Sequence, residues 1–151
     1  MLLASPACAW EVGLITTVVN NDSGGGVAYG EKVMIRYELF KYFDVGARAG
    51  FMHSESLDAE YFPLEATAAI KYPFLEGRFV PFIGAAFGYH FYTTDTYRNS
   101  QALTAGGGMD IRFGEEKKWS LFLEGYYQMG HVHFDATTSV PNDGPGGSIG
   151  F

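Results

Sequence analysis

The sequence predicts an all-β fold: an eight-stranded antiparallel up-and-down transmembrane β-barrel that occupies residues 10–151. Three observations lead to this prediction. Apolar side chains alternate with charged or small ones, as in residues 64–72, and a strand points successive side chains to opposite faces. The alternating segments are close to the roughly 9–11 residues that a tilted strand needs to cross a bilayer. All charges in residues 32–40, 44–52, 64–72, 103–113 and 120–129 fall on one of the two faces of their segment.

The pattern divides the chain into eight strands joined by alternately long and short connections. The predicted strands are 11–19, 31–40, 44–53, 63–72, 79–92, 101–113, 119–130 and 145–151. The predicted long connections are 20–30, 54–62, 93–100 and 131–144, and the short ones are 41–43, 73–78 and 114–118. Four long loops at one end and three short turns at the other are typical of bacterial outer-membrane barrels.

Each strand is justified by its own residues, taken in chain order. The first follows Trp10 and places Glu11 on the charged face, the fourth alternates throughout residues 64–72, and the fifth is rich in aromatic residues and glycine. The eighth ends with Ile149 and Phe151, two positions apart. The other four strands carry uncharged, mostly apolar side chains at every second position: Val33, Ile35, Tyr37, Leu39; Val45, Ala47, Ala49, Phe51; Leu103, Ala105, Met109, Ile111, Phe113; and Leu121, Leu123, Tyr127, Met129.

The opposite face holds a balanced set of charges. Its members are the acids Glu11, Glu38, Glu65, Asp110 and Glu124 and the bases Lys32, Arg36, Arg48, Lys71 and Arg112. A narrow lumen can bury charges only if they pair, so we predict that salt bridges plug the lumen and that the apolar face meets lipid. Alternation alone does not identify the inner face, which leaves a soluble, lipocalin-like small-molecule binder as an alternative.

Composition limits the classes of partner. The chain has 17 acidic and 10 basic residues, and setting aside the five of each on the charged face leaves 12 acids and five bases for loops, turns and ends. These acidic, glycine-rich loops are expected to meet an extracellular partner. Nucleic acid is excluded as a partner, because the chain offers no basic patch to neutralise phosphates.

Residues 1–9 are predicted to be the remnant of an export signal peptide. Ala7-Cys8-Ala9 matches the small-x-small cleavage pattern immediately before Trp10. Cleavage there removes the only cysteine, which excludes a disulfide framework and a cysteine-based metal site in residues 10–151. A lipoprotein acylated at Cys8 is the alternative interpretation of this segment.

Three segments carry a family resemblance. Val80-Pro81-Phe82-Ile83-Gly84-Ala85-Ala86-Phe87-Gly88-Tyr89, the glycine-rich residues 106–113 and the terminal Phe151 resemble the small outer-membrane barrels of the outer-membrane protein A and X types. The resemblance implies residence in the outer membrane of a Gram-negative bacterium, among its lipid and lipopolysaccharide. It also implies insertion by the barrel-assembly machinery, which in such proteins reads a final strand like the one ending in Ile149 and Phe151. Many unrelated activities use this scaffold.

One segment suggests chemistry. His131, His133 and Asp135, followed by Ser139, supply the residue types of a hydrolytic triad. The segment is also similar to the outer-membrane lipid A deacylases, whose His-x-Ser-Asn pattern precedes an Asn-x-Gly turn; here His133 and Phe134 replace the Ser and Asn. Two histidines and a carboxylate in a loop are too few to predict a metal site.

We interpret the chain as a non-enzymatic outer-membrane barrel with a structural or surface-interaction role and no cofactor. Two alternatives remain open. The first is a lipid A deacylase-like hydrolase that uses His131 or His133. The second is a narrow ion pore, which requires the salt bridges to rearrange because side chains nearly fill a lumen of eight strands.

Overall fold

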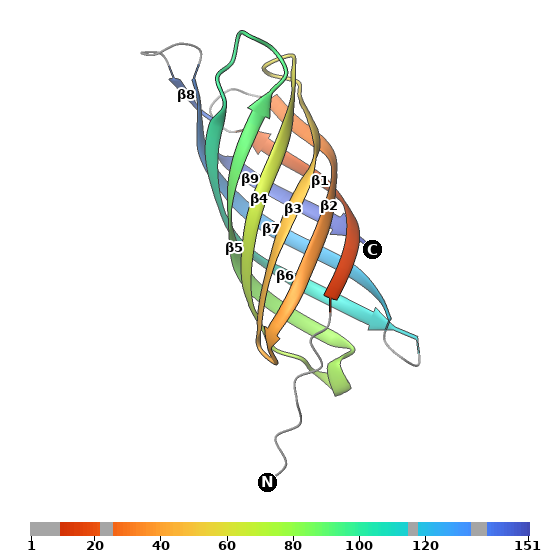
Figure 1. Cartoon of the computed structure of the whole chain (residues 1–151). Coiled ribbons are helices and arrows are strands. Elements are labelled where there is room, and N and C mark those ends of the chain that lie inside the picture. Colours follow the sequence, from red (N-terminus) through yellow and green to blue (C-terminus); the bar gives the residue numbers. More distant parts are fainter. Residues whose placement is uncertain (1–9, 22–25, 115–117, 134–138) are drawn as a thin grey trace.

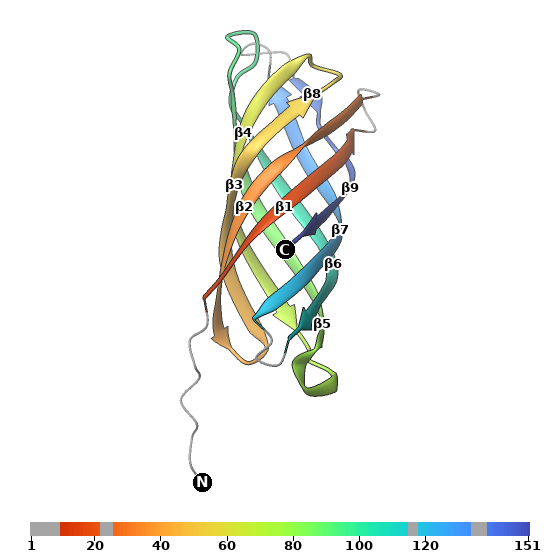
Figure 2. The same cartoon turned by 90° about the vertical axis from the view of Figure 1, so that its right-hand side faces the viewer.

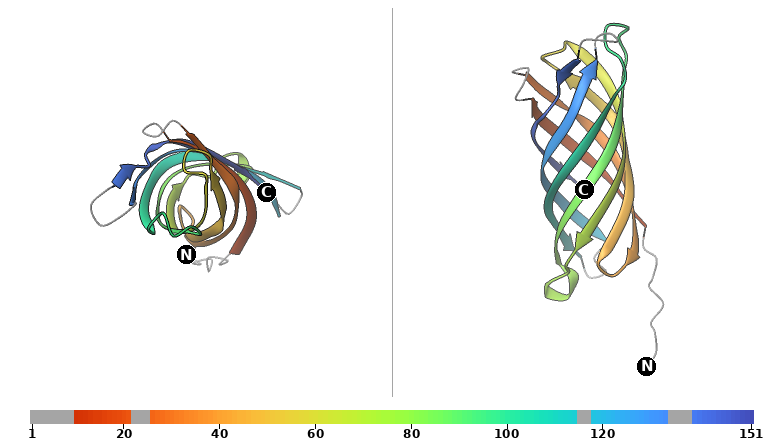
Figure 3. Two further views of the ribbon diagram at one scale, coloured as in Figure 1. Left: turned by 90° about the horizontal axis from the view of Figure 1, so that it is seen from above. Right: turned by 90° about the vertical axis from the view of Figure 1, so that its left-hand side faces the viewer.

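The computed structural model describes residues 10–21, 26–114, 118–133 and 139–151. Their strands are antiparallel and form a closed barrel (Figure 1; end-on in Figure 3, left). No helix in these ranges is long and apolar enough to cross a membrane. The strands are β1 (Trp10–Asn21), β2 (Gly26–Phe40), β3 (Phe43–Ser54), β4 (Ala59–Lys71), β5 (Phe79–Tyr92), β6 (Ser100–Phe113), β7 (Trp119–His133), β8 (Ser139–Pro141) and β9 (Gly144–Gly150), with a 3₁₀ turn η1 (Leu75–Gly77) between β4 and β5.

Neighbouring strands in the chain pair with each other, and β9 pairs with both β7 and β1 to close the ring. The seam between β1 and β9 is short: it joins Ile15–Val19 to Gly146–Gly150, whereas β1 pairs with β2 along its whole length. Figure 2 shows β1 and β9 side by side, with the carboxyl end partway along the barrel. Inside the barrel, the hydroxyl groups of Thr17 and Ser148 lie 3.0 Å apart across this seam.

The last strand is longer than predicted and is interrupted. β8 and β9 follow one register along β7, with His131 opposite Pro141 and Gln128 opposite Gly144. Between them the Asn142 N–H donates to the Gly130 carbonyl at 2.8 Å, and the Asp143 carboxylate accepts the Gly130 N–H at 2.8 Å, so a side chain replaces one of the two backbone hydrogen bonds. The prediction of a loop was therefore wrong for residues 131–133 and 139–144, whereas residues 134–138 lie outside the described residues. Pro141, Asn142 and Gly144, whose residue types are typical of turns, interrupt a strand here instead.

The predicted alternation of long and short connections was also wrong. β1 to β4 extend further than expected at the end that carries connections 22–25, 55–58, 93–99 and 134–138, which we call the loop end. Those connections have four, four, seven and five residues, against two, seven and five for connections 41–42, 72–78 and 114–118 at the opposite, turn end. Pairing continues through polar residues at the loop end, where the sequence pattern alone suggests loop.

Apolar side chains point outward and form a belt around the barrel. Large members such as Ile35, Ile83 and Leu103 are exposed, and Trp10 and Trp119 are exposed at the turn end. At the loop end several outward positions are polar, and we call these residues the polar rim: Glu31, His53, Glu60, Gln101 and His131. An apolar outer surface bounded by aromatic and polar residues is typical of a transmembrane barrel, and it is the reverse of a lipocalin-like barrel.

Two layers of apolar side chains lie inside the barrel. One consists of Ile15, Met34, Phe82 and Phe122, and the other, nearer the loop end, of Val19, Ala28, Met52 and Tyr61. Glycines permit close approach of the backbone between β2 and β3 and between β6 and β7. A Cβ on Gly50 would overlap the carbonyl oxygen of Glu31, and a Cβ on Gly108 would overlap that of Leu123.

Candidate functional site

The turn end of the lumen holds two clusters of ion pairs. Lys71 Nζ lies 2.6 Å from Glu38 Oε2 and 2.7 Å from Asp44 Oδ1. In the second cluster, Glu11 accepts hydrogen bonds from Arg36 and from Arg112, both at 2.7 Å. Arg36 also reaches Asp110 at 2.9 Å. Charges from β1, β2, β3, β4 and β6 therefore meet inside the barrel.

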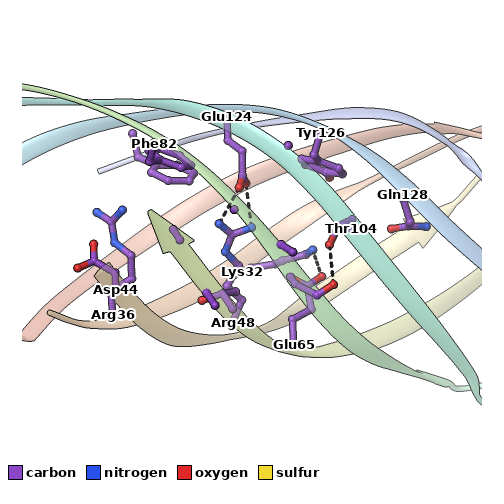
Figure 4. Close-up of a pocket in the computed structure, with 18 residues that line it drawn as sticks. Lys32, Arg36, Asp44, Arg48, Glu65, Phe82, Thr104, Glu124, Tyr126 and Gln128 are labelled. Carbon is purple, nitrogen blue, oxygen red and sulfur yellow. Dashed lines mark hydrogen bonds and ion pairs between the residues drawn. The ribbon is translucent and has the colours of Figure 1, made fainter. Parts of the chain in front are cut away.

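The middle of the lumen is crossed by further pairs (Figure 4). Arg48 on β3 donates two hydrogen bonds to Glu124 on β7, at 2.8 and 3.0 Å, in the bidentate geometry that strengthens arginine–carboxylate pairs. Lys32 on β2 donates to Glu65 on β4, and both of these side chains are buried. The sequence predicted that these residues face inward, but register and ring closure decide which acid meets which base.

Aromatic rings pack against these charges. The rings of Phe82 and Phe122 stack with centroids 5.3 Å apart. The guanidinium carbons of Arg36 and Arg48 lie 5.3 and 5.5 Å from the centroid of the Phe122 ring, at cation–π distance. Phe82 and Phe122 belong to the charged face of their strands by position, and their role was missed because the sequence analysis treated that face as charged and small.

Glycines make room for the long charged side chains. The register places Lys32 opposite Gly50, Glu65 opposite Gly88, and Glu124 opposite Gly108. Each charged chain can therefore extend into the lumen without meeting a side chain from the residue paired with it. A cavity beside Arg48 and Glu124 has a volume of about 30 Å³, room for one or two water molecules.

The structure places all ten predicted lumen residues in ion pairs and adds an eleventh, Asp44. Six acids thus share five bases, so the predicted equality of five and five was wrong. Asp44 was missed because it follows a predicted turn. Its position, two and four residues before Gly46 and Arg48 on the same face, is the signal that identifies it.

The histidine segment lies at the loop end, away from the lumen charges. His131 is exposed on the outer face of β7, and the backbone register places His133 opposite Ser139. Asp135 and residues 1–9 lie outside the described residues. Within the described ranges no group of three or more His, Cys, Asp or Glu side chains is arranged to hold a metal ion.

Ile149 and Phe151 both expose their side chains at the carboxyl end. The backbone of Phe151 exchanges two hydrogen bonds with Leu14 of β1, at 2.9 and 3.0 Å. The two residues predicted as an assembly signal therefore lie beside the seam, on the outer surface.

No family model matches the chain, and no curated protein matches it. Two solved structures are similar to it. Neisserial surface protein A (NspA) is 13% identical, with a TM-score of 0.64 over 93% of this chain and 92% of that one. A structure described as de novo design of transmembrane β-barrels is 16% identical, with a TM-score of 0.52 over 99% and 98% of the chains. The chain thus has the fold of small transmembrane β-barrels, which confirms the predicted fold class and its resemblance to small outer-membrane barrels.

Proposed function

We propose that the protein is a non-enzymatic outer-membrane β-barrel of a Gram-negative bacterium, with a structural or surface-interaction role and a lumen plugged by salt bridges. The observation that carries this proposal is the contrast between the two faces of the wall. Apolar side chains surround the outside, and eleven charged side chains pair across an interior whose cavity beside Arg48 and Glu124 has a volume of about 30 Å³. Side chains that fill a small lumen are typical of eight-stranded barrels without an open channel.

The proposed partners follow from the same surfaces. The apolar belt is expected to contact outer-membrane lipid and lipopolysaccharide. The loop end, with Glu31 and Glu60 on the polar rim, is expected to meet any extracellular partner, and Ile149 and Phe151 to meet the barrel-assembly machinery. The alternative of a pore requires Arg48 and Glu124 to separate.

Gel mobility tests the membrane-barrel proposal. The chain is refolded in detergent micelles and, separately, in plain buffer, and each sample is run with and without boiling. We expect a β-rich species whose mobility changes on boiling in micelles alone, because the apolar belt needs a lipid-like solvent. A stable folded monomer in plain buffer contradicts the proposal and favours a soluble barrel.

Fatty-acid release from lipopolysaccharide tests the non-enzymatic part. The folded protein and its His131→Ala variant are incubated separately with lipopolysaccharide, and free fatty acid is measured. We expect no release above the rate without protein. Release by the unmodified protein that His131→Ala abolishes would replace this part of the proposal with lipid A hydrolysis.

A further inference from the structure

An open notch interrupts the outer surface at the loop end. Pairing between β6 and β7 stops at Ala102 and Gly130, while β7 continues to His133 along β8. β8, the blue arrow outside the ring in Figure 3 (left), follows β7 away from β6. The notch left between the strands has a volume of about 850 Å³.

The lining of the notch changes from apolar to polar along the barrel axis. Phe87, Leu103 and Met129 line its lower part, and all three are exposed members of the apolar belt. Gln101 and His131 lie one outward position higher, on the polar rim. The notch therefore crosses the boundary at which the outer surface turns from apolar to polar. An occupant that matches both parts is an amphiphile with its hydrocarbon chain below and its headgroup above.

The polar part of the notch favours an uncharged headgroup. Its hydrogen-bonding side chains include the amides of Gln101 and Asn99 and the imidazole of His131, and none of its described lining residues is lysine or arginine. A phosphate headgroup would find no cation there. The Asp143 carboxylate at the rim, which accepts the Gly130 N–H, opposes an anionic headgroup. Neutral hydroxyl groups can both donate to and accept from these amides.

We propose that this notch binds one neutral glycolipid of the surrounding leaflet. Its acyl chain lies along Phe87, Leu103 and Met129, and its sugar hydroxyls bond to Gln101, His131 and Asn99. The inference rests on the proposed function, since it requires the apolar belt to lie in a membrane. It adds a site for a particular class of lipid to a surface that otherwise meets bulk lipid.

Methionine-methyl NMR tests the proposal on the full chain. Protein labelled with ¹³C at its methionine methyl groups is placed in nanodiscs of phosphatidylcholine, and monoglucosyl diacylglycerol is added to them. We expect the Met129 methyl signal to shift and saturate, because this side chain lines the notch. Met109 serves as an internal control, since it faces outward near the turn end of β6 and should not shift. Equal responses of the two methyl groups would overturn the proposal.

Variants and a second lipid sharpen the test. Gln101→Ala and His131→Ala should each weaken glycolipid binding about fivefold, as expected for one lost hydrogen bond. Leu103→Trp should fill the lower notch and abolish the Met129 shift, whereas Ile35→Trp, which adds the same bulk on β2, should leave it unchanged. Phosphatidylglycerol that shifts Met129 as strongly as the glycolipid would overturn the proposal. Absence of the heat-modifiable band in micelles refutes the membrane barrel itself. A folded barrel whose Met129 methyl signal does not shift when glycolipid is added refutes the glycolipid site alone.

Discussion

The interior of this barrel depends on pairs of residues more than on single ones. A buried charge is tolerated when its partner lies at hydrogen-bonding distance, as Glu124 does for Arg48. The same pair depends on Gly108, which faces Glu124 across the β6–β7 ladder. A substitution of one lumen residue is therefore expected to change the environment of its ion-pair partner as well.

Glu124→Ala should lower the free energy of unfolding by about 3–5 kcal/mol, because it leaves the buried Arg48 guanidinium without its carboxylate. Arg36→Ala should act in the same direction on Glu11 and Asp110. Urea unfolding in detergent measures the change. The double variant Arg48→Met with Glu124→Met should recover most of the loss, and Asp95→Ala in connection 93–99 should cause none. Equal stability of Glu124→Ala and Asp95→Ala would contradict the plugged lumen.

Gly108→Ala should destabilise the barrel by about 1–3 kcal/mol, since its methyl group would overlap the Leu123 carbonyl oxygen and the backbone must shift. Gly125→Ala provides the matched control. Gly125 lies on the partner strand β7 and faces outward, with no atom within 4 Å of an added Cβ. The fraction of each variant that folds in micelles is measured and compared. Similar fractions would refute the close approach of β6 and β7 at Gly108.

Among the elements, β7 pairs with three other strands. It pairs with β6 on one side and with β9 and β8 on the other, and the Asp143 carboxylate bridges the interruption between the last two. This bridge keeps β8 in register with β9. It also holds one wall of the notch in place.

Asp143→Ala should free the Gly130 N–H and speed its hydrogen exchange at least about tenfold, because a hydrogen bond to a charged group is lost. Asp143→Asn keeps an acceptor oxygen and should change the exchange rate less. Amide exchange by NMR measures both variants, with the Gly125 amide as reference. An unchanged rate at Gly130 in Asp143→Ala would show that the carboxylate does not bridge the interruption.

The sequence was sufficient to predict the strands where they cross the apolar belt, because a membrane requires apolar residues at every outward position. Beyond the belt this requirement ends. β4 continues through the charged outward residue Glu60, and β2 continues beyond Glu31 to Gly26, so both strands were predicted too short. The ion-pair partners of Arg48 and Lys32 could not be predicted, because they depend on ring closure and on the register between strands. The alternation of residues within one strand determines neither.

At the scale of the whole molecule, the barrel is a closed wall around a filled interior. Ion pairs occupy the turn end and the middle of the lumen, and apolar layers are stacked between and above them. We therefore expect water to have no continuous route past the Arg48–Glu124 pair and the Phe82–Phe122 stack. We therefore expect partners to contact the outer surface or one of the two ends of the barrel.

The unmodified protein should show no steady single-channel current when reconstituted in a planar lipid bilayer, because its side chains fill the lumen. Insertion is verified beforehand by the heat-modifiable band of the same preparation. Regular conductance steps of uniform size would contradict this expectation and favour the narrow pore.

The short seam between β1 and β9 also bears on the order in which the barrel folds. Thr17 and Ser148 are separated by 131 positions in the chain, and the ring cannot close until both strands are present. Contacts between such distant residues form late, since the intervening chain must first be ordered. We therefore expect this seam, the shorter of the two ladders by which β9 closes the ring, to form late in folding and to open early in unfolding.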